Sequence, residues 1–154
     1  MLMNVAPAST GRPAPLWRCF AGMVYDLLPL LALWIIGSAL WMLAFHRGDT
    51  LQQLASAVRS PLDIVLRDAL LLVLGAAYFV LSWVRVGATI GMRAWKLRLV
   101  RDDGARVDVR TALLRFALAL LSLAALGAGF WYAWFDPERR TWHDRVCGTR
   151  VTRW

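Results

Sequence analysis

Three long apolar runs dominate the chain and constrain its fold more than any other feature. They cover residues 16–45, 62–84 and 111–135, and charged or polar segments separate them. A helix needs about 20 apolar residues to cross a bilayer, so each run is long enough to span a membrane. The chain is therefore predicted to be an all-α integral membrane protein with about three transmembrane helices.

One membrane domain, at residues 16–154, accounts for most of the 154 residues. Residues 1–15 are polar and contain three prolines, and they are predicted to form a disordered N-terminal arm. The apolar run that follows is much longer than the core of a signal peptide. We therefore expect the first helix to remain uncleaved.

The formal net charge of +8 raises the question of a nucleic-acid partner. The arginines lie beside the apolar runs, however, and do not form one basic face with interleaved aromatic residues. Many of the nine tryptophans lie near the ends of the runs, as expected for an interfacial belt. The expected partners are the lipid bilayer and its anionic headgroups, not nucleic acid.

Four residues could act as soft metal ligands: Cys19, Cys147, His46 and His143. They do not have the spacing of a metal site, and two cysteines give no disulfide framework. Although His143 and Asp144 are adjacent, no serine or cysteine stands at the spacing of a catalytic nucleophile. We therefore expect no metal, no cofactor and no enzymatic activity.

Alternating residues mark a small β element between the second and third runs. The alternation covers residues 96–100 and 105–109, with an Asp-Gly turn between them, which predicts a cytoplasmic β-hairpin. Just before it, residues 89–95 fit a helical turn lying at the membrane interface.

The third run allows two interpretations. Its length and apolarity suit one ordinary span, with Arg115 snorkelling at its end. That topology would place the five arginines of the tail outside, against the positive-inside tendency. A break at the small residues 124–129 would instead make a re-entrant hairpin. Asp144 could then approach Arg18, and residues 148–152 could pair with the strand around 97–100.

Asp26 is the most informative charged residue, because it lies eight residues beyond Arg18 within an apolar run. Eight residues correspond to about 12 Å of helix rise, which predicts a position near mid-membrane. An ionised carboxylate there costs about 2.5–3.5 kcal/mol, so it needs a partner, a proton or an ion.

Pro29 adds a second feature close to Asp26. Proline lacks an N–H, so the Tyr25 carbonyl loses its usual helical donor one residue from the carboxylate. The pair is consistent with a cation or proton site. It is also consistent with a packing device, in which Asp26 bonds a neighbouring helix or Arg18 and fixes the bundle.

Three ordered motifs resemble those of the RDD family, a group of small membrane proteins named for one arginine and two aspartates. They are WRCFA at residues 17–21 followed by Asp26, GATIGMR at 87–93 leading into LRLV at 97–100, and WHDRVCGTRV at 142–151. The resemblance covers most of the chain. It assigns the family's arginine to Arg18 and its aspartates to Asp26 and Asp144.

The chain departs from many relatives in the middle motif, where Arg93 stands near the usual lysine. The resemblance implies a bacterial cytoplasmic (inner) membrane and a multi-pass topology. It also implies transport of an unidentified ligand, or of cations and protons as attributed to some members. Two functions remain open: a transporter that uses Asp26, and a non-transporting scaffold, partner subunit or lipid-binding module. Since three helices form a thin wall, a homo-oligomer or a membrane partner could complete a transport path.

Charge between the runs predicts the orientation. The loop of residues 46–68 has three arginines balanced by three aspartates, whereas residues 85–110 contain seven basic residues and three aspartates. Because basic loops stay in the cytoplasm, the N-terminus and the 85–110 loop are predicted to be cytoplasmic.

Overall fold

The computed structural model describes residues 13–57 and 60–153 and is mostly helical, as predicted. Two helices are long and apolar enough to cross a membrane. The predicted disordered arm, residues 1–15, lies outside the described residues except for its last three. In chain order the elements are α1 (Leu16–Phe45), α2 (Leu51–Ala57), α3 (Pro61–Arg85), α4 (Ile90–Ala94), β1 (Leu97–Arg101), α5 (Val109–Ala124), α6 (Ala128–Trp131), the 3-10 helix η1 (Tyr132–Trp134), α7 (Trp142–Cys147) and β2 (Thr149–Arg153).

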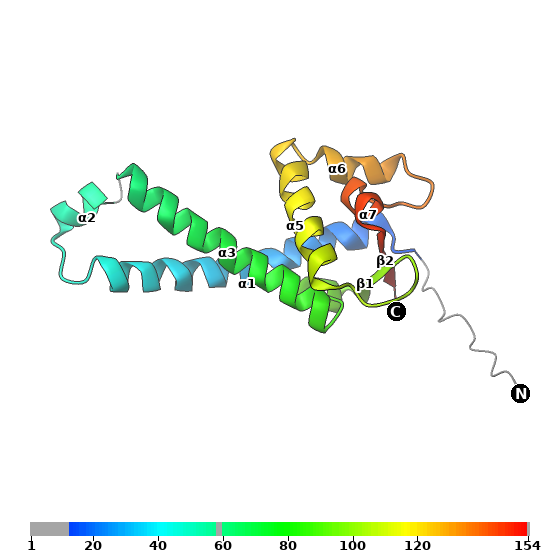
Figure 1. Ribbon diagram of the computed structural model, residues 1–154, viewed down its shortest axis with the longest axis horizontal. Coiled ribbons are helices and arrows are strands. Elements are labelled where there is room, and N and C mark those ends of the chain that lie inside the picture. Colours follow the sequence, from blue (N-terminus) through cyan, green and yellow to red (C-terminus); the bar gives the residue numbers. More distant parts are fainter. Residues whose placement is uncertain (1–12, 58–59, 154) are drawn as a thin grey trace, which may run out of the picture. The chain divides into compact units, whose positions relative to one another are not determined.

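The chain divides into two compact units (Figure 1). One unit, Leu27–Tyr78, is a helical hairpin made of most of α1 and most of α3. Its helices approach closely at Gly37, where an added Cβ would lie 2.7 Å from the Leu74 side chain. The Trp34 indole also donates to the Leu71 carbonyl at 3.3 Å. Small residues and indole bonds of this kind hold helices together where lipid surrounds them.

The loop end of this hairpin is fastened by polar side chains. Asp63, in the first turn of α3, accepts hydrogen bonds at 3.0 Å from the Trp41 indole and from His46 Nε2. Nδ1 of the same histidine lies 3.0 Å from Asp49 Oδ2. His46 therefore bridges two carboxylates, one from each side of the loop.

The other unit combines Met1–Asp26 with Phe79–Trp154 and contains the sheet. β1 pairs antiparallel with β2, in a register that runs from Leu97 opposite Arg153 to Arg101 opposite Thr149. The Ala14 amide donates to the Val151 carbonyl at 3.2 Å, which ties the start of α1 to the sheet. Leu97 and Leu99 point into the core, as alternation predicts. The buried apolar residues around them include Val80, Trp83, Val107 and Ala112.

The predicted partner strand at residues 105–109 is wrong, because this segment does not join the sheet. The turn itself forms: Gly104 has φ +79° and its amide donates to Arg101 O at 2.9 Å. Asp108 then caps α5 by accepting from the Thr111 amide and hydroxyl, so the chain turns into a helix. β2, from the C-terminal tail, takes the place beside β1.

The third apolar run is broken within residues 124–129, as one of the two interpretations of the sequence predicted, and a continuous helix over residues 111–135 does not form. α5 ends at Ala124, and the segment Ala128–Phe135 follows at an angle of 96°. Gly127 (φ +77°) makes the turn, and Leu126 has φ +55°. In Figure 1, α7 and β2 follow this bend and return to β1. The segment between β1 and β2 therefore begins and ends at the same sheet.

Candidate functional site

Asp26 is buried, with 5% of its surface exposed, and it contacts the start of α4. Its Oδ2 accepts a 2.5 Å hydrogen bond from the Thr89 hydroxyl, and its Oδ1 accepts a 2.8 Å bond from the Gly91 amide. Thr89 also caps α4 by accepting from the Met92 amide at 3.2 Å. Both oxygens of the Asp26 carboxylate therefore accept hydrogen bonds beside the start of a helix, where a negative charge is favoured.

A close backbone contact between Gly22 and Gly91 makes these bonds possible. A Cβ added to Gly91 would overlap the Gly22 carbonyl oxygen and would lie only 2.8 Å from Asp26 Cγ. Only glycine therefore allows α4 to approach α1 closely enough for its amide to reach the carboxylate. This contact explains why the second glycine of the 87–93 motif, Gly91, has no side chain.

Arg18 lies at the beginning of α1 among aromatic rings. Its Nη1 is 3.5 Å from the Trp95 carbonyl, and its guanidinium carbon is 5.0 Å from the centre of the Trp17 ring. The Trp17 and Tyr25 rings both meet Trp95 edge to face, at centroid distances of 5.4 and 5.8 Å. Arg18 and Tyr25 thus contact the end of α4 that lies opposite the Asp26 bonds.

Asp144, on α7, forms the second buried charge centre. Its Oδ1 accepts from Arg115 Nε on α5 at 2.9 Å, and Arg115 Nη2 lies at the same distance. The hydroxyls of Thr149 and Thr141 donate to the carboxylate at 3.1 and 2.6 Å. Asp144 is 3% and Arg115 7% exposed. The guanidinium carbon also lies 4.5 Å from the centre of the Trp83 ring, a cation–π distance.

Electrostatics fix the protonation states of this centre. Burial opposes ionisation of Asp144, but the Arg115 charge, then His143 and the Thr141 hydroxyl, outweigh it, so the pKa of the carboxyl is lowered. For His143, burial is the largest cause and Arg115 the next, and together they lower its pKa to about 4 against the opposing charge of Asp144. At neutral pH the centre is an ion pair beside a neutral imidazole.

The predicted charged trio does not form one cluster of direct contacts. Within the described residues, no hydrogen bond or ion pair joins Arg18 to Asp144, and Arg115 occupies the position expected for Arg18. Pro29 lies inside α1, in the Leu27–Tyr78 unit. Arg93 is exposed on α4.

Sequence reasoning missed Arg115 and Thr89 as the partners of the two aspartates. A signal for Arg115 was present, because a charge within an apolar run needs an explanation. The predicted explanation, that Arg115 snorkels to the membrane surface, is wrong because the Arg115 side chain is buried. Thr89 gave a weaker signal, as a threonine directly before a short helical segment.

No group of three or more His, Cys, Asp or Glu side chains in the part of the chain that the structure describes could hold a metal ion. The candidate site consists of two buried contacts in one unit, Asp26 with the start of α4 and Asp144 with Arg115.

These features define the class: a small, all-α membrane protein with two or three candidate spans, a broken third apolar run and a two-stranded sheet. The sequence model of the RDD family matches residues 13–148, which include Arg18, Asp26 and Asp144, and the chain belongs to this family. No curated protein and no solved structure matches the chain.

Proposed function

We propose that this chain is a multi-pass protein of a bacterial cytoplasmic membrane and acts as a module that binds anionic phospholipid headgroups. The binding surface is the basic segment that runs from the end of α3 into β1, formed by Arg85, Arg93, Lys96 and Arg98. The proposal includes no enzymatic reaction and no nucleic-acid partner.

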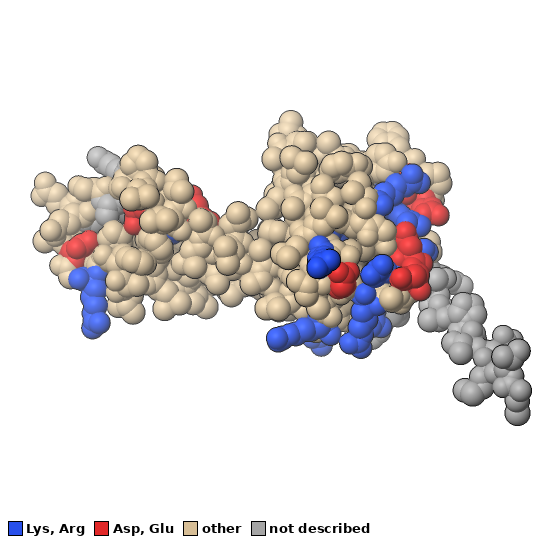
Figure 2. Space-filling model, in the orientation of Figure 1, with Lys and Arg blue, Asp and Glu red and all other residues tan. Residues whose placement is uncertain are grey.

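The main support for lipid binding is that all four side chains of the basic segment are exposed. None of them has a carboxylate partner among residues 13–57 and 60–153. Several arginines of the same unit do have carboxylate partners: Arg150 pairs with Asp102 at 3.1 Å and Arg145 with Asp136 at 2.8 Å. Figure 2 shows basic side chains gathered over the unit that carries the sheet. An anionic surface would supply the missing counter-charge.

Apolar side chains beside the basic segment support a position at the membrane interface. Val86 and Ile90 are exposed within it, and Trp17 is exposed at the start of α1. A short helix with both cationic and apolar exposed side chains suits the boundary between headgroups and acyl chains. Each basic side chain near an anionic leaflet contributes about 1 kcal/mol, roughly a fivefold gain in affinity.

The buried contacts explain how the basic segment is positioned. Asp26 holds the start of α4 through Thr89 and Gly91, and Arg18 contacts the Trp95 carbonyl at its end. On this proposal Asp26 is a positioning residue for α4, which supports the packing interpretation over the cation site.

Lipid selectivity tests the proposal. The full chain is reconstituted in phosphatidylcholine, and its relative affinities for spin-labelled phosphatidylglycerol and phosphatidylcholine are measured. The wild type should prefer the anionic lipid. A triple variant, Arg93→Gln, Lys96→Gln and Arg98→Gln, should lose most of that preference, as should the wild type in high salt.

The matched control is Arg101→Gln, since Arg101 already has Asp103 and Asp108 within 3.6 Å. It should retain the preference. Equal affinity of the wild-type chain for both lipids would contradict the proposal.

A second candidate function, cation or proton transport, is favoured by one observation: the buried position of Asp26 in a candidate span. The test is flux into liposomes with the wild type, Asp26→Asn and Thr89→Val. Flux that depends on Asp26 would select transport, and sealed liposomes would select the lipid-binding module.

A further inference from the structure

Arg18 lies in the first turn of the candidate membrane span Leu16–Phe45 and is half-buried. In the part of the chain that the structure describes, its guanidinium contacts the Trp95 carbonyl and the Trp17 ring, and no carboxylate pairs with it. Partial burial removes water from the guanidinium, which makes an unpaired charge costly. An anion that reached Arg18 would supply the counter-charge.

The hydrogen-bonding capacity of Arg18 identifies the kind of anion. The distance from Nη1 to the Trp95 carbonyl is 3.5 Å, longer than the usual range of about 2.7–3.2 Å, so this bond is weak. A guanidinium has five N–H donors in a planar fork. Two oxygen atoms of one phosphate fit this fork, with two parallel charge-assisted hydrogen bonds.

The surroundings of Arg18 identify the molecule that carries the phosphate. Trp17 and Phe20 are 57% and 68% exposed on the same end of α1, and Trp17 and Tyr25 both contact the Trp95 ring. Tryptophan and tyrosine gather at the level of lipid headgroups. A cation among exposed aromatic rings at the end of a span suits the phosphate of a bilayer lipid, whose apolar part can lie against the rings.

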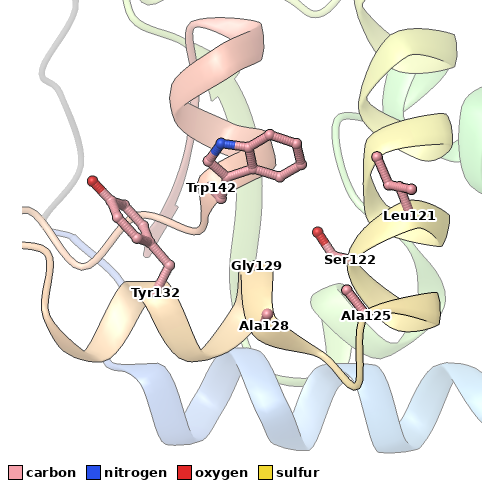
Figure 3. A pocket seen from close by; sticks show the side chains of 7 residues that line it. All are labelled: Leu121, Ser122, Ala125, Ala128, Gly129, Tyr132 and Trp142. Carbon is pink, nitrogen blue, oxygen red and sulfur yellow. The ribbon is translucent and has the colours of Figure 1, made fainter.

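The groove at the bend between α5 and α6 has a different chemistry (Figure 3). Its volume is about 310 Å³, seven described residues line it, and none of these seven is charged. A phosphate there would lose its hydration without gaining a positive partner. The phosphate of a lipid therefore favours Arg18 over this groove.

We propose that Arg18 binds the phosphodiester of one membrane phospholipid. The guanidinium donates to two phosphate oxygens, and the glycerol and first acyl methylenes lie against Trp17 and Phe20. The inference rests on the proposed function for its class of ligand and adds a defined phosphate site. Since phosphatidylcholine and phosphatidylglycerol carry the same phosphodiester, Arg18 binds both, whereas the basic segment discriminates between them.

Photo-crosslinking tests the site. The full chain, in a detergent without phosphate, is mixed with a trace of phosphatidylcholine that carries a diazirine in its headgroup, and labelled peptides are mapped by mass spectrometry. Labelling of the wild type should concentrate on residues 16–21 and 93–98. Arg18→Gln should reduce it about tenfold, as expected for the loss of a hydrogen bond to a charged group. Arg18→Lys should give an intermediate yield, because lysine keeps the charge and loses the fork.

Arg110→Gln is the matched control, since Arg110 is also exposed without a carboxylate partner among the described residues of the same unit. Labelling in this variant should equal that of the wild type. Equal losses in Arg18→Gln and Arg110→Gln, or wild-type labelling spread evenly over the apolar helices, would overturn the proposal.

Competition distinguishes the possible ligands. Excess unlabelled phosphatidylcholine or phosphatidylglycerol should displace the probe, whereas diacylglycerol, which lacks the phosphate, and inorganic phosphate should not. Equal displacement by diacylglycerol would overturn the phosphate contact, and displacement by inorganic phosphate would overturn the assignment to a lipid.

The same variants separate this site from the basic segment. If the wild type prefers phosphatidylglycerol but Arg18→Gln is labelled like the wild type, the Arg18 site is wrong and the proposed function stands. If labelling depends on Arg18 but the wild type has equal affinity for both lipids, the Arg18 site stands and the headgroup selectivity is wrong.

Discussion

Arg115 and Asp144 are 29 positions apart in the sequence, and Arg115 Nη2 lies 2.9 Å from Asp144 Oδ1 in the interior of the sheet-containing unit. The contact joins α5 to α7 beyond the break in the third apolar run. Because both residues are buried, removal of either one leaves an uncompensated charge.

We predict that Asp144→Asn or Arg115→Gln lowers the free energy of unfolding by about 3–5 kcal/mol, the usual cost of breaking a buried ion pair. Thermal unfolding in detergent measures the loss. The control is Arg67→Gln, which removes an exposed pair with Asp68 and should cost about 0–1 kcal/mol. Equal effects of the buried and exposed changes would show that the buried pair does not join α5 and α7.

The two facing glycines predict opposite results for the same substitution. Gly91→Ala should displace α4 from α1, because the new Cβ would meet Asp26 Cγ at 2.8 Å and its amide nitrogen at 3.0 Å. Gly22→Ala brings contacts of 3.6 Å, which are ordinary, and alanine favours the α1 helix by about 0.5–1 kcal/mol. We therefore expect a clear fall in melting temperature for Gly91→Ala and no fall for Gly22→Ala. A tolerated Gly91→Ala would contradict the close approach.

The long helices could be predicted from the sequence because their signals are local. The apolar runs at residues 16–45 and 62–84 correspond to α1 and α3 within a residue, since length and hydropathy alone decide a span. The helical turn at residues 89–95 was likewise predicted, and it is α4.

Long-range pairing was harder to predict. The alternation at residues 105–109 is compatible with a strand, but the Asp108 cap starts a helix and β2 supplies a better partner for β1. Asp26 was predicted from its position in an apolar run to lie within the membrane, and Asp144 was identified only through the family resemblance. Their partners, Thr89 and Arg115, depend on how distant segments meet, and no local periodicity carries that information.

His46 makes the loop end of the Leu27–Tyr78 unit sensitive to pH. Hydrogen bonds from its ring to Asp63, and then to Asp49, raise the pKa of His46 above 6.5. Because the folded pKa is the higher one, the stabilisation is complete below pH 6.5 and is lost as pH rises through the folded pKa.

The difference in melting temperature between the wild type and His46→Gln should thus be largest near pH 6 and should shrink at alkaline pH. His143 provides a contrast of opposite sign: its folded pKa of about 4 lies below the unfolded value of 6.5, so the stability of the wild type relative to His143→Gln should fall as the pH drops below 6.5. A constant difference for His46→Gln from pH 6 to 9 would contradict the bridge to Asp49 and Asp63.

The pairing of β1 with β2 constrains on which side of the membrane the C-terminal tail can lie. β1 precedes the broken run and β2 follows it, and the Arg140 guanidinium lies 2.9 Å from Asp102 in the turn after β1. Both ends of the broken run must then lie on one side of the membrane. We therefore predict that the pair α5 and α6 enters the bilayer and returns, with its irregular backbone buried against protein.

Cysteine labelling can check this arrangement in right-side-out and inverted vesicles. In a chain with Cys19→Ala and Cys147→Ala, a membrane-impermeant maleimide should label Arg106→Cys and Glu138→Cys from the same side, predicted to be cytoplasmic. Gln52→Cys, in the loop between the two long helices, should react only from the other side. All three positions are exposed, so access to the reagent differs only by the membrane. If Glu138→Cys reacts from the side of Gln52→Cys, the third run crosses the bilayer, and the β1–β2 pairing cannot exist in the membrane.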